Sequence, residues 1–216
     1  MNIRRQLSAL LLMLPLAAFA VPYAPGAASD ASIVAGRDYI ELAAPLPVST
    51  GNKLEVREFF FYGCSHCFDL EPAVNGWLKR KPADVALVRT PAVFNAKWEV
   101  LARAYYVADE LQMLDKIHAP IYSAIHIKNE KLDSQEALGK FFVRMGATQA
   151  QFDAAWNSTR VNLSVKNAEV LARKYMIQGT PTLTVNGKYV VPAAGERTFA
   201  IVDFLLGKER VARAGK

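Results

Sequence analysis

Two cysteines, Cys64 and Cys67, are the only ones in the chain, and two residues separate them. A strand-like, largely apolar run, 54–62, leads directly into the pair, and a helical pattern follows from Phe68. This order predicts that Cys64 lies in the first turn of a helix, where the helix dipole and unpaired N–H groups favour a thiolate over a thiol. Because a thiolate is the species that attacks a disulfide, the pair suits electron exchange.

Two other roles for the cysteine pair are open. A structural disulfide closing so short a loop would constrain the unfolded chain little. A zinc ion usually takes four ligands. The imidazoles available are His66 and, far along the sequence, His118 and His126. We favour the redox interpretation over both alternatives.

The N-terminal residues have the pattern of a secretory signal peptide. Arg4 and Arg5 precede an apolar stretch, 7–16, that is too short to span a bilayer, and Ala18-Phe19-Ala20 offers a small-residue cleavage site. We predict a signal peptide at residues 1–20, cleaved after Ala20, and a flexible lead-in at residues 21–37. The prediction places the mature protein in an oxidising compartment outside the cytoplasm, where disulfides persist.

Charge gives little sign of a nucleic-acid partner. The formal net charge of +6 becomes +4 without Arg4 and Arg5, and most remaining basic residues alternate with acids, as in 128–133. No basic stripe of the kind that binds phosphate backbones is apparent. We predict a monomeric exported protein that binds no nucleic acid.

The first half of the chain predicts a βαβ unit. Strand patterns occupy 39–42, 54–61 and 85–90, and a helix from 64 to 81 joins the last two. The strand at 54–61 is too apolar for a sheet with one wet face, so we expect helices on both faces. A strand–helix–strand order of this kind is typical of parallel pairing.

Helical periodicity then dominates residues 96–176. Two pairs inside it, Asp133 with Glu136 and Thr148 with Gln151, have capping-box spacing and predict helix starts. Beyond it, Asn186-Gly187 joins two short strand patterns and predicts a β-hairpin, which a closing helix follows. The fold class is therefore α/β with a mixed sheet.

Several motifs, in this order, resemble the DsbA family of periplasmic thiol:disulfide interchange proteins. They are the C-x-x-C pair at a helix start, Thr-Pro before the hairpin, Glu58-Phe59-Phe60, the run 153–158 and the run 185–189. The resemblance implies a thioredoxin-like fold with an inserted helical domain. The implied boundaries are 38–95 and 166–216 for the two parts of the thioredoxin-like domain, and 96–165 for the insertion.

The resemblance also implies a function. The protein would donate its Cys64–Cys67 disulfide to unfolded or newly exported cysteine-containing proteins in the periplasm. A quinone-linked membrane protein of the DsbB type would reoxidise it, and no metal or organic cofactor would be needed. Cys64 would be the nucleophile and Cys67 the resolving thiol. An isomerase or reductase kept reduced by a membrane partner is one alternative, and a non-catalytic chaperone or binding module is another.

A carboxylate inside an apolar strand requires a partner, because burying an unpaired charge is expensive. Glu58 is such a residue, and Arg89 on the adjacent predicted strand is the obvious counter-ion. Since arginine does not give up its proton, we expect it to hold Glu58 ionised firmly. Glu58 would act as the proton acceptor for Cys67 through water, with a plain structural ion pair as the alternative.

Three further residues are candidates for the site. His66 would favour the Cys64 thiolate and so make the disulfide a stronger oxidant. Pro181 is expected to follow a cis bond and to lie against the two sulfurs, beside backbone that pairs with an extended substrate. Thr180 and Ser65 depart from the valine and the proline found in other members of the family.

Overall fold

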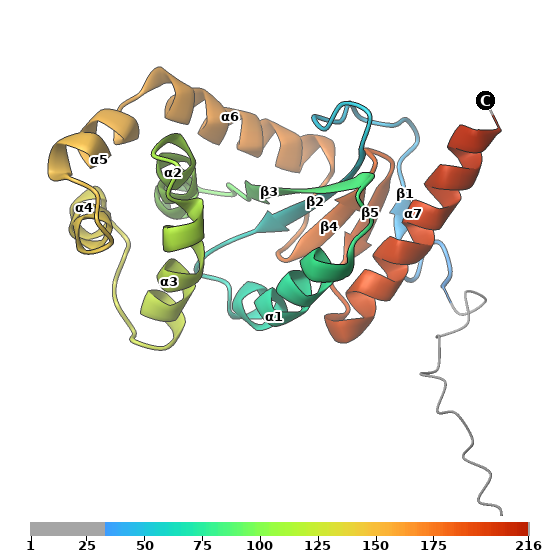
Figure 1. Cartoon of the computed structure of the whole chain (residues 1–216), viewed down its shortest axis with the longest axis horizontal. Coiled ribbons are helices and arrows are strands. Elements are labelled where there is room, and N and C mark those ends of the chain that lie inside the picture. Colours follow the sequence, from blue (N-terminus) through green and yellow to red (C-terminus); the bar gives the residue numbers. More distant parts are fainter. Residues whose placement is uncertain (1–32, 216) are drawn as a thin grey trace, which may run out of the picture.

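The computed structural model describes residues 33–215, so the predicted signal peptide and most of the lead-in lie outside the described residues. In this part of the chain, five consecutive helices separate a first group of strands from a second (Figure 1). In chain order they are β1 (Ile40–Glu41), β2 (Leu54–Phe60), α1 (Ser65–Arg80), β3 (Val85–Pro91), α2 (Ala96–Glu110), α3 (Leu114–His126), α4 (Gln135–Arg144), α5 (Gln149–Trp156), α6 (Thr159–Lys174), β4 (Thr182–Val185), β5 (Tyr189–Pro192), a 3₁₀ turn (Gly195–Arg197) and α7 (Thr198–Ala214).

The strands form one mixed sheet in the order β1-β5-β4-β2-β3. β2 and β3 are parallel, whereas β2–β4, β4–β5 and β5–β1 are antiparallel. All seven residues of β2 are buried, because helices cover both faces of the central strand. The predicted βαβ unit and mixed sheet are confirmed.

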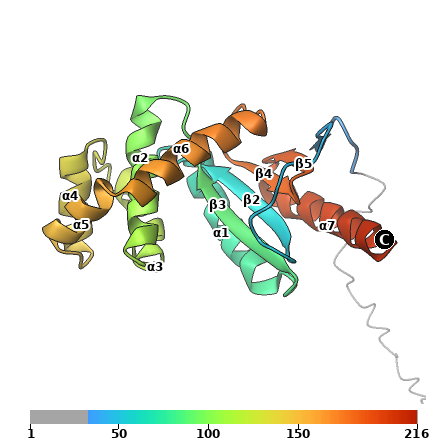
Figure 2. The same cartoon turned by 90° about the horizontal axis from the view of Figure 1, so that it is seen from above.

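Opposite faces of the sheet carry different helices. α1 and α7 lie together on one face, and α6 crosses the other (Figures 1 and 2). Side chains of a strand alternate between faces, so Val56 and Glu58 point toward α1 while Arg57 and Phe59 point toward α6. Val56 accordingly packs in the core shared with α1 and α7, and Phe59 packs in the core beneath α6.

Helices α2 to α5 form a block beside the sheet, and their core continues into the redox region. The same cluster of buried residues holds Phe60, Tyr62 and Cys67 together with side chains of the helical block. The predicted boundary between 165 and 166 falls inside α6. That helix packs Val161 on the helical block and Ala172 beneath the sheet, so it joins the two parts.

Helices begin near both predicted starts, but only one of the two predicted capping boxes forms. Thr148 and Gln151 form a complete capping box at α5. At α4 the cap is Ser134, whose hydroxyl accepts from the amide of Ala137, so the Asp133–Glu136 pairing is wrong. Among the described residues, none of the helices is both long and apolar enough to cross a bilayer.

The hairpin between β4 and β5 turns through two left-handed residues, as the sequence predicts. Asn186 has φ 50° and Gly187 has φ 71°. At Gly187 an added Cβ would lie 2.0 Å from the backbone oxygen of Leu46, so both conformation and space require glycine. The turn also holds the chain before β2, because the Leu46 amide donates to the Gly187 carbonyl.

We predict that Gly187→Ala lowers the free energy of unfolding by about 4 kcal/mol, through left-handed strain combined with backbone overlap. Gly51 is a matched control, because it is also left-handed, with φ 60°, but an added Cβ there meets nothing within 4 Å. Gly51→Ala is expected to cost only about 1–2 kcal/mol. Urea unfolding of both variants measures the difference, and equal losses would contradict the role of the Leu46 contact.

Candidate active site

Cys64 is the N-cap residue of α1, as predicted, and its side chain is half-buried. Its backbone is extended, with φ −91° and ψ 118°, and none of its own side-chain atoms caps the helix. The sulfur therefore stays available at the positive end of the helix dipole, where negative charge is stabilised. Its Sγ lies 3.3 Å from the carbonyl oxygen of Thr180, to which the thiol donates.

Cys67 lies one turn into α1, and its side chain is completely buried. Both cysteines are free thiols in this structure. Burial raises the pKa of the Cys67 thiol well above its usual value, although hydrogen bonds from the Phe61 backbone and the Thr180 side chain oppose the increase. Cys64 is thus the accessible sulfur and Cys67 the one that holds its proton.

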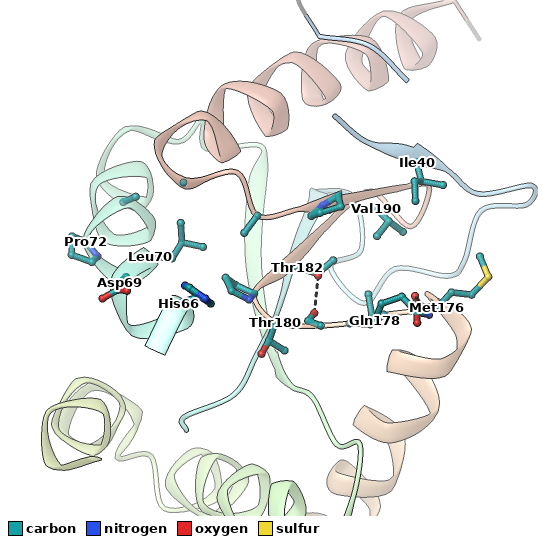
Figure 3. Close-up of a pocket in the computed structure, with 17 residues that line it drawn as sticks. Ile40, His66, Asp69, Leu70, Pro72, Met176, Gln178, Thr180, Thr182 and Val190 are labelled. Atoms are coloured by element: carbon teal, nitrogen blue, oxygen red, sulfur yellow. Dashed lines mark hydrogen bonds between the residues drawn. The ribbon is translucent and has the colours of Figure 1, made fainter. Parts of the chain in front are cut away.

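The loop before β4 lies against both sulfurs. The Thr180–Pro181 peptide bond is cis, as predicted. Thr180 accepts a hydrogen bond from Cys64 through its carbonyl oxygen, and its side chain acts to lower the pKa of the Cys67 thiol. A hydrogen bond of 2.8 Å from the Thr182 hydroxyl to the Gly179 carbonyl fixes the loop as it enters β4 (Figure 3).

A groove of about 880 Å³ opens beside the cysteines. His66 is exposed and extends from the start of α1 toward the loop that carries Thr180, with Ile40 and Val190 across the groove (Figure 3). The lining is mostly apolar and includes Leu70, Met176, Pro181 and Pro192. Such a surface suits an extended, partly apolar peptide segment.

The predicted pair of Glu58 and Arg89 is present. Arg89 Nε donates to Glu58 Oε2 over 3.1 Å, and Glu58 is almost completely buried. The expectation that arginine holds this carboxylate firmly ionised is wrong. Desolvation outweighs the attraction of Arg89, and the nearby Glu71 adds repulsion, so the pKa of Glu58 rises from 4.5 to about 7.

Three residues that the sequence analysis did not assign to the site extend this pair into a network. Arg89 Nη2 also lies 3.5 Å from Glu71 Oε2, and Glu71 Oε1 lies 3.2 Å from His118 Nε2. On its other side, His118 Nδ1 lies 2.8 Å from the hydroxyl of Tyr62. Strand β2, helix α1, strand β3 and helix α3 therefore meet in one buried hydrogen-bonded chain.

The two histidines that are distant in sequence lie close to the site in space. His118 belongs to the buried chain, while His126 Nε2 lies 2.8 Å from the carbonyl oxygen of Tyr62 and its ring stacks on Phe68. Nothing in the sequence indicates that these histidines approach the site, because the packing of α3 against α1 brings them there. Glu71 could have been found from the sequence, since it lies four residues after Cys67 on the same helix. Among residues 33–215, no group of three or more histidine, cysteine or acidic side chains is placed to hold a metal.

Comparison with known proteins agrees with this geometry. Residues 85–201 match the DSBA-like thioredoxin domain. The thiol:disulfide interchange protein DsbA of Pseudomonas aeruginosa is 36% identical over 190 residues, which cover 86% of this chain and 90% of that protein. The chain belongs to the DsbA family. It is a thiol:disulfide oxidoreductase, and Cys64 and Cys67 have the spacing of a C-x-x-C motif.

Two further relatives extend the comparison. DsbA of Bordetella pertussis is 35% identical over 179 residues, 81% of this chain and 85% of that protein. The crystal structure of Pseudomonas aeruginosa DsbA superimposes with a TM-score of 0.81 at 35% identity, covering 86% of this chain and 98% of that one. Reduced DsbA1 of Neisseria meningitidis gives a TM-score of 0.75 at 30% identity, with 86% and 100% covered. The thioredoxin-like fold of the DsbA family is thereby confirmed.

The raised pKa of Glu58 predicts a specific pH dependence of stability. Because the folded protein holds this proton more tightly than the unfolded chain, the free energy of unfolding should fall as pH rises from 4.5 to about 7. The fall attributable to Glu58 is about 3 kcal/mol. Urea unfolding of reduced Glu58→Gln should lack it, whereas the exposed control Glu136→Gln should keep it. Parallel pH profiles for wild type and Glu58→Gln would contradict the assignment.

Proposed function

We propose that this DsbA family member works as an oxidant, donating its Cys64–Cys67 disulfide to newly exported proteins in the periplasm. The observation that carries the proposal is the asymmetry of the pair. Cys64 is half-buried at a helix N-terminus, while Cys67 is fully buried with a raised thiol pKa. The accessible sulfur of Cys64 is stabilised as an anion by the helix N-terminus, so it is a good leaving group from a mixed disulfide. This favours transfer of the disulfide to the substrate.

The reaction is a two-electron exchange through a mixed disulfide. A substrate thiolate attacks Cys64 Sγ, a substrate–Cys64 bond forms, and the bond to Cys67 breaks. Cys67 leaves as a thiolate and takes up a proton, since burial disfavours its charge. A second substrate thiolate then attacks the substrate sulfur of the mixed disulfide and releases Cys64 as a thiolate. The substrate is oxidised and the protein is reduced.

Glu58 is our candidate for the acid and base that serves Cys67. Its pKa of about 7 lets it give or accept a proton near neutral pH. Burial is the main cause of the raised pKa of the Tyr122 phenol, and the charges of Cys67 and Glu58 both add to it, which is consistent with the two groups lying in one buried region. Glu58 would donate a proton when the disulfide opens and accept one when it closes.

The groove and the loop beside the cysteines are our candidates for substrate binding. The carbonyl oxygen of Thr180 accepts from Cys64, and Pro181 and His66 line the groove next to Cys64. We assign to His66 the stabilisation of the Cys64 thiolate, and to the loop backbone the pairing with an extended substrate segment.

The remaining assignments follow from family membership and the sequence. We propose periplasmic localisation after cleavage at Ala20, a monomeric state, and reoxidation by a quinone-linked membrane protein of the DsbB type. The disulfide itself serves as the redox group, as it does in the family. The division into a thioredoxin-like domain and a helical insertion at 96–165 also stays a proposal.

Single substitutions separate the roles of the two sulfurs. Cys64→Ser should abolish oxidation of a reduced, unfolded substrate, because no accessible sulfur remains. Cys67→Ser cannot form the intramolecular disulfide, so it should also fail to oxidise that substrate. Given a substrate that carries a disulfide, its Cys64 thiolate should attack that bond, release one substrate thiolate and accumulate as a mixed disulfide, because Cys67 is absent and cannot displace the substrate from Cys64. Non-reducing gel electrophoresis and mass spectrometry detect these species. If Cys64→Ser oxidises no substrate but supports the folding of exported proteins as well as the wild type does, the chaperone alternative is favoured.

The direction of electron flow can be measured from stability. An oxidant of this type should have a more stable reduced form, because the interactions of the Cys64 thiolate are lost when the disulfide forms. Guanidinium unfolding of the reduced and oxidised proteins, side by side, gives the difference. A more stable oxidised form would instead identify a reductase.

A further inference from the structure

One wall of the groove beside the cysteines is a single face of helix α1. His66, Asp69, Leu70 and Ala73 all line the opening, and steps of three or four residues connect them along the helix. The loop before β4 and strand β5 form the opposite wall (Figure 3). A substrate segment held between the two walls therefore passes these side chains in turn as it leaves Cys64.

Asp69 is the acidic residue of this wall. Among the described residues that line the groove, His66 and Asp69 are the ones with ionisable side chains. Asp69 is exposed, and no ion pair or side-chain hydrogen bond joins it to another residue within 33–215. Glu71, on the other side of the same helix, is instead paired with Arg89. The charge of Asp69 is thus free to act on whatever occupies the groove.

A second acceptor lies beside Asp69. Pro72 also lines the groove, and it has no N–H, so the carbonyl of Phe68, four residues earlier, lacks the donor that the helix would otherwise supply. A carboxylate and a carbonyl on consecutive residues suit an ammonium or a guanidinium group, which brings several N–H donors and no acceptor.

The apolar walls of the groove strengthen the effect of this charge. Ile40 and Met176 line the groove and expose 51% and 61% of their surface, so a bound segment has apolar area to cover. Covering these side chains removes water from the space that Asp69 faces. Because charges interact more strongly where water is excluded, Asp69 would discriminate between substrate side chains of opposite charge.

We propose that Asp69 is a specificity-determining residue, which favours substrate segments that carry lysine or arginine two or three residues from the reacting cysteine. The inference rests on the proposed function, since it requires a substrate held in the groove. Asp69 lies five residues after Cys64, about 7.5 Å further along the axis of α1. An extended chain covers that distance in two or three residues, at about 3.3 Å each.

The expected preference has the opposite sign to the one that net charge would produce. The formal charge of +6 falls to +4 when the two arginines of the predicted signal peptide, Arg4 and Arg5, are removed. Long-range attraction by a basic protein favours acidic substrates. Asp69 favours basic ones at close range, so the sign of the measured preference separates the two effects.

Activated peptides test the preference directly. Peptides that differ only in a Lys, Gln or Glu are joined through their cysteine to thionitrobenzoate and mixed with the reduced protein. Cys64 Sγ attacks the peptide sulfur, a Cys64–peptide disulfide forms, and the coloured thionitrobenzoate leaves with the electrons of the broken bond. Stopped-flow absorbance gives the second-order rate constant of this step. It forms the same mixed disulfide as substrate oxidation does.

The ratio of the Lys rate to the Glu rate is the quantity compared between variants, since the intrinsic reactivity of each peptide cancels. We expect this ratio to be about 10-fold higher in the wild type than in Asp69→Asn. In Asp69→Lys it should fall by about a further 10-fold. The Gln peptide reports any change in the reactivity of Cys64 itself. An equal ratio in the wild type and Asp69→Asn would overturn the proposal.

A matched variant controls for net charge. Asp133 is also exposed and lies between α3 and α4, outside the groove lining, so Asp133→Asn removes the same charge elsewhere. Its ratio should equal that of the wild type. An equal fall in Asp133→Asn and Asp69→Asn would assign the effect to net charge and overturn the role of Asp69.

The position of the charged residue is a further test. It is placed three residues before the cysteine in one peptide set and three residues after it in another. An effect of Asp69→Asn confined to one set supports a held segment and gives its direction. Equal effects in both sets would indicate a diffuse field and would overturn the subsite.

Failure of this inference is distinguishable from failure of the proposed function. If the wild type oxidises a reduced, unfolded protein while its peptide ratios do not depend on Asp69, the oxidant role stands and the specificity is wrong. If the wild type oxidises no such protein, the proposed function is wrong, and the inference that rests on it is withdrawn as well.

Discussion

The chemistry of this protein depends on making two identical thiols different over a single helical turn. Cys64, at the N-cap, receives the positive end of α1 and partial contact with solvent. Cys67, one turn further, loses all contact with water, and its thiol pKa rises for that reason. The difference requires the sheet to deliver the chain at the end of β2 and the helix to begin at once. Every other element of the site acts on this asymmetry.

A thiolate that must appear and disappear in a dry interior requires a nearby group that exchanges its proton. We assign this exchange to Glu58, whose surroundings favour neither charge state strongly. Desolvation and Glu71 act against ionisation of Glu58, and Arg89 acts for it. A stronger counter-ion alone would have held Glu58 permanently charged, and burial alone would have held it neutral. The balance near neutral pH comes from opposing large effects, as in other functional carboxyl groups.

The sequence predicts those features of the fold and site that depend on local patterns. Cys64 as helix start, the βαβ unit, the Asn186-Gly187 turn and the pairing of Glu58 with Arg89 follow from periodicity, turn chemistry and the cost of buried charge. The sequence fails where a local signal is ambiguous, since Asp133 and Ser134 are equally good cap residues and packing decides between them. The sequence also does not predict the size of pKa shifts, because the pKa of Glu58 depends on how completely the folded protein excludes water from the site.

The contacts of α3 with the site were not predictable for a different reason. Glu71 and His118 are 47 residues apart, and nothing local marks them as partners. Their contact depends on how helices α2 to α5 pack against the sheet and α1. The hydrophobic core indicates that this packing also serves the redox site. Cys67 and Tyr62 share one hydrophobic cluster with α2 to α5, so the helical block closes the back of the redox site. A thioredoxin-like sheet without it would leave Cys67 and Glu58 open to water on that side. The helical block therefore buries Cys67, and this burial creates the asymmetry between the two cysteines.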